Sequence, residues 1–156
     1  MTRRVALVVL AMASVALLTA PASSLQRRGA PDLARYAGRY PFDRVDGVRF
    51  LNHPLVRQAV ANAAPSPRVR SRILAVGTSG IIVVTRAMVL ARACEPHNCG
   101  SHNWSIVIGR RNQAQFVCYK PDGGSARWYR RQRVVAEGGG CPFEGAEVPA
   151  AVLGAL

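Results

Sequence analysis

Two cysteines, two histidines and a carboxylate stand close together in the segment ARACEPHNCGSHNW, residues 91–104. Cys94, His97, Cys99 and His102 are of the residue types that ligate zinc. The same thiols could instead supply a nucleophile that a neighbouring imidazole activates, as in cysteine hydrolases. In a third interpretation the two thiols form a disulfide that staples a loop around the tetrapeptide EPHN. The compartment of the protein separates these interpretations, because it sets the oxidation state of the thiols.

The beginning of the chain indicates export. Residues 1–22 have the parts of a secretory signal peptide: Arg3 and Arg4 supply positive charge, residues 5–20 are an uncharged apolar run, and small residues favour cleavage after Ala22. The apolar run is shorter than the ~20 residues of a membrane-spanning helix. We therefore predict a periplasmic or secreted protein with no transmembrane segment after cleavage.

Four cysteines in an exported domain permit three disulfide connectivities. We favour Cys94 with Cys99, because Pro96 already restricts the short segment between them, and Cys118 with Cys141, because three glycines before Cys141 let the chain turn back. Four ligands within nine residues are also too crowded for the usual structural zinc site.

The stapled loop is therefore our preferred interpretation of residues 94–99. The sequence has no G-x-S-x-G elbow, H-E-x-x-H pair or glycine-rich phosphate loop. We predict that the protein is not an enzyme and that it holds neither a metal nor a cofactor.

The chain is strongly basic, with 21 Lys and Arg against 8 Asp and Glu and a formal net charge of +13. Every basic residue except Lys120 is an arginine. Such a charge attracts polyanions, so anionic lipid or polysaccharide of the cell envelope is a candidate partner. The arginines are scattered and aromatic residues are few, so we predict no dedicated nucleic-acid binding.

A short N-terminal part precedes one folded domain. Residues 23–39 lack an apolar period and are predicted to be a linker or loose arm, whereas residues 40–156 are predicted to form a single domain. Apolar residues recur at helical spacing from Leu55 to Ala63, so we predict an amphipathic helix over residues 54–64 that Pro65 and Pro67 terminate.

After the turn sequence GTSG the pattern changes to that of strands. Residues 81–93 predict one long or two short strands, and further strands are expected at residues 103–109, 114–120 and 125–135. The predicted fold class is α+β: an N-terminal helix packed on one face of an antiparallel sheet of about five strands, with the stapled loop between strands.

The loop sequence CEPHNC resembles the Cys-Lys-Pro-His-Asp-Cys loop of the inhibitor of vertebrate lysozyme (Ivy) family. Cys94, Pro96, His97 and Cys99 match that loop in identity and spacing. The resemblance implies an exported bacterial inhibitor with a helix-backed antiparallel sheet. It also implies that residues Glu95, Pro96, His97 and Asn98 enter the cleft of a lysozyme-type muramidase or lytic enzyme, where His97 meets the catalytic carboxylates.

A different function stays open. In it, the protein associates with the envelope through its arginines, and the 94–99 loop is purely structural. The other prominent side chains have structural interpretations: His53 begins the helix, His102 caps or buttresses the loop, and four aromatic residues at strand spacing pack in the core or at its edge, namely Trp104, Phe116, Trp128 and Tyr129.

Overall fold

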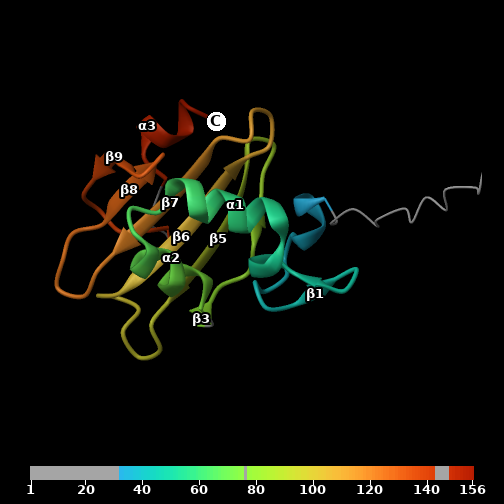
Figure 1. Ribbon diagram of the computed structural model, residues 1–156, viewed down its shortest axis with the longest axis horizontal. Coiled ribbons are helices and arrows are strands. Elements are labelled where there is room, and N and C mark those ends of the chain that lie inside the picture. The colour runs from blue at the N-terminus through green and yellow to red at the C-terminus, as the bar shows by residue number, and fades with distance from the viewer. Residues whose placement is uncertain (1–31, 76, 143–147) are drawn as a thin grey trace, which may run out of the picture.

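The computed structural model describes residues 32–75, 77–142 and 148–156. The predicted signal peptide, residues 1–22, and the first part of the predicted linker, residues 23–31, lie outside these ranges. Among the described residues no helix is long and apolar enough to cross a membrane. The fold combines helices with an antiparallel sheet and two disulfides (Figure 1).

The main sheet has seven strands in the described part of the chain, and all its pairings are antiparallel. Its order is β3-β5-β6-β7-β8-β9, and β4 also pairs with β5. The strands are β3 (Thr78–Ser79), β4 (Val83–Val84), β5 (Met88–Cys94), β6 (Asn103–Gly109), β7 (Gln115–Lys120), β8 (Arg127–Arg130) and β9 (Arg133–Glu137). A separate hairpin joins β1 (Arg44–Val45) to β2 (Val48–Arg49).

The expectation of about five strands was too low for two reasons. The segment GTSG, predicted to be a turn, contributes β3, which pairs with the end of β5. The single strand predicted for residues 125–135 is a hairpin of β8 and β9, because Arg131 and Gln132 both have positive φ, at 49° and 65°. Two consecutive residues of that kind reverse the chain in the manner favoured by two-residue hairpins.

The two longer helices each begin at a proline that follows a capping residue. Helix α1 (Pro54–Ala63) confirms the helix predicted for residues 54–64, and the His53 side chain caps it by accepting a hydrogen bond from the Leu55 N–H at 3.2 Å. Helix α2 (Pro67–Leu74) was not predicted, because Pro67 was interpreted as a terminator. Pro67 instead stands in the first turn of α2, where no N–H is needed, and Ser66 caps that turn.

Both faces of the sheet are covered. Trp104, Ile106 and Ile108 project from β6 into a core beneath α1 and α2, which lie in front of the sheet in Figure 1. Val107 of β6 and Trp128 of β8 belong to a second core on the opposite face, under the short helix α3 (Ala150–Leu153). All seven residues of β6 are consequently buried.

Part of the predicted loose arm belongs to the first core. Residues 33–36 form a short 3₁₀ helix, η1 (Leu33–Tyr36), and both Leu33 and Tyr36 are buried. A second 3₁₀ helix, η2 (Phe50–Asn52), leads into α1. The four aromatic residues expected to pack in the core or at its edge, Trp104, Phe116, Trp128 and Tyr129, are all buried.

Candidate functional site

The loop carrying the CEPHNC sequence connects β5 to β6. Antiparallel pairing of these strands ends at the pair Cys94 and Asn103, and the Glu95 N–H then donates to the His102 carbonyl at 3.0 Å. The intervening chain extends beyond the end of the sheet, where it is the yellow loop in Figure 1. Two of the longest strands of the sheet therefore hold the base of this loop.

Both expected disulfides are formed. Cys94 pairs with Cys99 across a Cα–Cα distance of 4.8 Å, and Cys118 pairs with Cys141 across 5.4 Å. The first disulfide closes the loop at its base, and the second lies in the core on the far face of the sheet. Because the loop thiols are bonded to each other, neither is free to ligate zinc or to act as a nucleophile.

Within the stapled ring the chain makes one tight turn. The Asn98 N–H donates to the Glu95 carbonyl at 3.0 Å, Pro96 occupies the second position of the turn, and His97 occupies the third with a φ of 62°. Proline followed by a residue of positive φ is the pattern of a type II turn. His97 thus stands at a position that glycine or asparagine normally fills.

The tip of this turn is presented to solvent. Pro96 and His97 are exposed, whereas Glu95 and Asn98 are half-buried. Among the described residues, none forms a hydrogen bond with the His97 ring. The exposed imidazole is therefore available to a partner, and the flanking residues hold the turn.

Two side chains outside the ring, His102 and Tyr119, support the base of the loop. His102 is buried, and its ring lies between the Glu95 carboxylate, 2.9 Å from Nδ1 to Oε2, and the Tyr119 hydroxyl, 2.9 Å from Nε2. The Asn98 amide also donates to Glu95 Oε2, at 3.1 Å. His102 thus buttresses the loop, as expected, whereas its partner Tyr119 on β7 was not identified from the sequence.

These contacts alter the acidity of two groups. The hydrogen bonds from His102 and then from Asn98 lower the pKa of Glu95 below its ordinary value. Partial burial raises the pKa of the Tyr119 phenol. Glu95 is accordingly an anion, and Tyr119 a neutral hydroxyl, at the pH values at which an exported protein works.

The backbone of the loop is fixed as well. The Asn103 amide donates to the Cys99 carbonyl at 2.7 Å, and the Lys120 ammonium donates to the Gly100 carbonyl at 2.6 Å. These two bonds tie the backbone at residues 99–100 to side chains of β6 and β7. The exposed turn is therefore carried by a base that is tied to β6 and β7.

A polar cleft of about 380 Å³ lies beside the loop base. Arg68 and Arg72 project into it from successive turns of α2, opposite Glu95, and Arg72 approaches the Glu95 carboxylate to 4.0 Å. Sequence reasoning missed these two arginines because it missed α2. Ser66 followed by Pro67 was the signal that could have found the helix.

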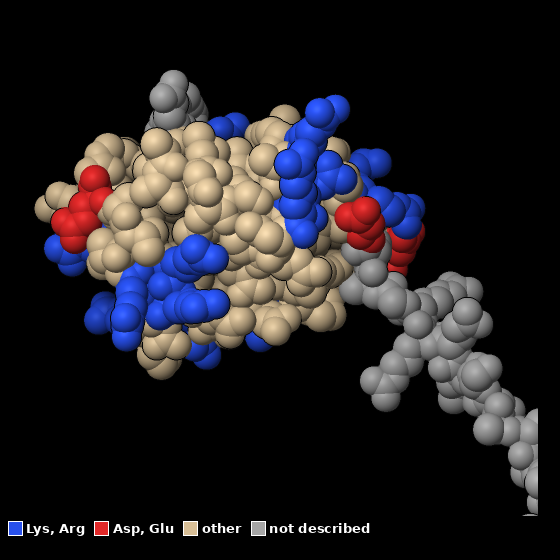
Figure 2. Space-filling model, turned by 90° about the horizontal axis from the view of Figure 1, so that it is seen from above, with Lys and Arg blue, Asp and Glu red and all other residues tan. Residues whose placement is uncertain are grey.

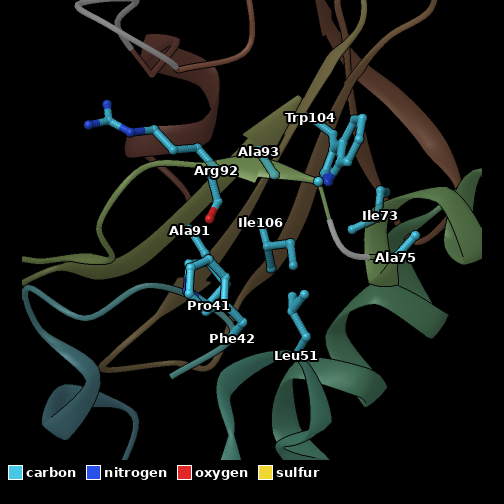
Figure 3. Close-up of a pocket in the computed structure, with 12 residues that line it drawn as sticks. Pro41, Phe42, Leu51, Ile73, Ala75, Ala91, Arg92, Ala93, Trp104 and Ile106 are labelled. Atoms are coloured by element: carbon cyan, nitrogen blue, oxygen red, sulfur yellow. The ribbon is translucent and has the colours of Figure 1, made fainter. Parts of the chain in front are cut away.

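A smaller apolar pocket lies between the helices and the sheet. Phe42, Leu51, Ile73 and Ile106 point toward one another there, and the side chain of Arg92 points away (Figure 3). Its volume of about 20 Å³ is that of roughly one water molecule. This space is a packing feature of the core and has no room for an organic ligand.

A comparison of the chain with models of known protein families, with curated proteins and with solved structures found no match in any of the three. The function must therefore be argued from the chemistry of the loop and its surroundings.

Proposed function

We propose that the protein is an exported inhibitor that blocks a lysozyme or a related peptidoglycan-cleaving glycosidase. In this proposal the 94–99 loop enters the active-site cleft of the enzyme, and His97 binds its catalytic carboxylates. The observation that carries the proposal is the exposed imidazole at the tip of a stapled turn, together with the resemblance of CEPHNC to the Ivy family loop.

The chemistry of the target suits an imidazole. Retaining glycosidases place two carboxyl groups roughly 5 Å apart, one of them protonated and the other ionised. The two nitrogens of His97 point in opposite directions around the ring, so one can donate to the ionised carboxylate while the other addresses the second carboxyl group. No other described residue at the loop tip offers both a donor and an acceptor on a rigid ring.

Rigidity of the loop would strengthen this contact. A loop that is already ordered does not lose conformational entropy when it binds. The Cys94–Cys99 disulfide, the turn at Pro96 and the bonds from His102 to Glu95 all restrict the loop before any partner arrives.

The positive net charge of the protein limits which enzymes it would inhibit. Cleavage after Ala22 would remove Arg3 and Arg4 and lower the formal net charge from +13 to +11. A protein with so positive a charge associates fastest with an acidic partner and is repelled by a strongly basic one. Arg68 and Arg72 beside the loop would face the rim of the target's cleft. We therefore favour a muramidase whose cleft is acidic, which includes endogenous cell-wall lytic enzymes as well as acidic lysozymes.

The proposal is tested by measuring how strongly the protein and its variants inhibit an animal lysozyme and several bacterial cell-wall muramidases. His97→Ala should weaken inhibition about 10- to 100-fold, the loss expected when a charge-assisted hydrogen bond is removed. Cys99→Ser should also weaken inhibition, through lost rigidity. The matched control is Asp46→Ala, which removes another exposed side chain from a residue of positive φ, and it should inhibit like the wild type. Equal inhibition by wild type and His97→Ala would refute the proposal.

The envelope-binding alternative makes different predictions for the same proteins. Retention on anionic vesicles or cell-wall polymer would then fall steeply with added salt and would not change in His97→Ala, because scattered arginines act through screened attraction. A wild type that inhibits no muramidase and shows this salt-sensitive retention would favour the alternative.

A further inference from the structure

A second polar cleft lies at the opposite end of the sheet from the 94–99 loop. It is bordered by the β6–β7 turn, the β8–β9 turn and the end of α1, and its volume is about 480 Å³. Strand β6 has seven residues, so its two ends lie about 20 Å apart at the rise of an antiparallel strand. This cleft is consequently separate from the loop and from the arginines beside it.

Amide side chains dominate the lining of the cleft. They come from three segments far apart in the sequence and are Asn62, Asn112, Gln113, Gln115 and Gln132. Asn62 donates to Gln115 Oε1 at 3.0 Å, which leaves the Asn62 carbonyl and the Gln115 amino group available. Gln113 and Gln132 are exposed, and in the described ranges their side chains form no hydrogen bond.

Two arginines complete the cleft. The guanidinium of Arg130 stacks over the buried Phe116 ring at 5.3 Å from its centroid, which fixes its position. Arg131 follows in the β8–β9 turn and is exposed. In the described part of the chain, neither arginine forms an ion pair with a carboxylate and no Asp or Glu lines the cleft. Both positive charges are therefore available to an anion.

The walls of the cleft are held in place. The Gln132 N–H donates to the Ala63 carbonyl at 3.2 Å, which joins the β8–β9 turn to the end of α1. Asn112 donates to the Ala155 carbonyl and accepts from the Ala114 N–H, both at 3.0 Å, which fixes the β6–β7 turn. Figure 2 shows the molecule from above, with basic side chains gathered in two main groups and uncharged surface between them.

We propose that this cleft binds an acidic, N-acetylated saccharide. Amide groups both donate and accept hydrogen bonds, so they match sugar hydroxyl and acetamido groups, while a guanidinium matches a carboxylate. Among the described residues the only apolar one that lines the cleft is the small Ala114, so these residues offer no surface for an acyl chain. Its volume lies within the range of small-ligand sites and fits one or two sugar units.

The saccharide cleft and the inhibitory loop act independently. A sugar bound at one end of the sheet leaves the other end exposed, so the protein could be held on an acidic glycan while its loop engages an enzyme. The proposal does not require the inhibitory function, and each can be tested without the other.

Calorimetric titration of the purified protein tests the cleft with four probes: N-acetylglucosaminyl-N-acetylmuramyl dipeptide, the neutral N-acetylglucosamine tetramer, inorganic phosphate, and phosphatidylglycerol vesicles. The acidic muropeptide should bind, and the other three should bind at least about tenfold more weakly. Comparable binding of phosphate or vesicles would overturn the proposal in favour of a general anion surface. No binding of the muropeptide would overturn it outright.

Variants of the protein test whether the muropeptide binds in this cleft. Arg131→Gln and Gln113→Glu should each weaken muropeptide binding at least about fivefold, through loss of a cationic partner and through repulsion. Arg49→Gln, on the β1–β2 hairpin, makes the same charge change as Arg131→Gln and should bind like the wild type. Equal weakening in Arg49→Gln would show that only net charge matters and would refute the cleft. His97→Ala should keep full muropeptide binding, which separates this result from the inhibition test.

Discussion

Replacing His97 with glycine should stabilise the protein and weaken its inhibition about 10- to 100-fold, as His97→Ala does. His97 has a φ of 62°, a conformation that costs a residue with a Cβ about 1–2 kcal/mol. Glycine avoids this cost but loses about 0.5–1 kcal/mol through the greater freedom of the unfolded chain. The Cys94–Cys99 disulfide already restricts the unfolded loop, so this loss should be at the low end of that range.

The net expectation is a gain of about 1 kcal/mol, or a melting temperature about 3–4 °C higher for a domain of this size. Thermal unfolding of the oxidised protein measures this gain, and a muramidase assay measures the loss of inhibition. Asn98→Gly is the matched control in the same ring. Asn98 is not among the residues of positive φ and donates to Glu95, so its replacement should lower the melting temperature.

The reasoning would be refuted if His97→Gly lowered the melting temperature as Asn98→Gly does. That result would mean that the positive φ of His97 carries no net energetic cost in the folded protein. A stabilised His97→Gly that still inhibits would instead show that the imidazole is not the inhibitory group. Backbone strain retained at an exposed residue is typical of functional positions, and this pair of measurements connects the strain to the function.

Two further predictions concern the support of the loop. Because the folded protein lowers the pKa of Glu95, its carboxylate contributes stability above the ordinary value of 4.5, and that contribution is lost as the pH falls through the lower folded value. The melting temperature of wild type should therefore exceed that of Glu95→Gln at neutral pH, and the two should converge below pH 4.5; a difference that is constant with pH would contradict this. Tyr119→Phe removes the hydroxyl 2.9 Å from His102 Nε2 and should cost about 1 kcal/mol in thermal unfolding. The disulfide still closes the loop in that variant, so inhibition should change less than threefold, and a loss as large as that of His97→Ala would show that the hydroxyl acts in binding rather than in support.

Local chemistry was sufficient to predict the stapled loop. Cys94 and Cys99 are five residues apart, with a proline between them, so their pairing depends on little beyond the segment itself and an oxidising compartment. The alternating apolar residues of 103–109 likewise predicted β6 correctly, because a two-residue period leaves few alternatives. Helix α1 was predicted from another local pattern, namely apolar residues at helical spacing with Pro54 in the first turn.

Tertiary structure decided everything that depends on residues distant in the chain. Pro67 is compatible with both the end of one helix and the start of the next; Ser66 before it favours a helix start, and α2 then packs through the buried Ile73 into the first core. The composition of residues 125–135 is compatible with a single strand. In the structure, pairing with β7 sets the extent of β8, and the chain then reverses at Arg131 and Gln132. Pairing of β6 with β7 places the Tyr119 hydroxyl against His102, and the three segments of the saccharide cleft meet only at one end of the finished sheet. Strand register determines which of these residues come into contact. Register depends on both paired strands, so no single segment encodes it.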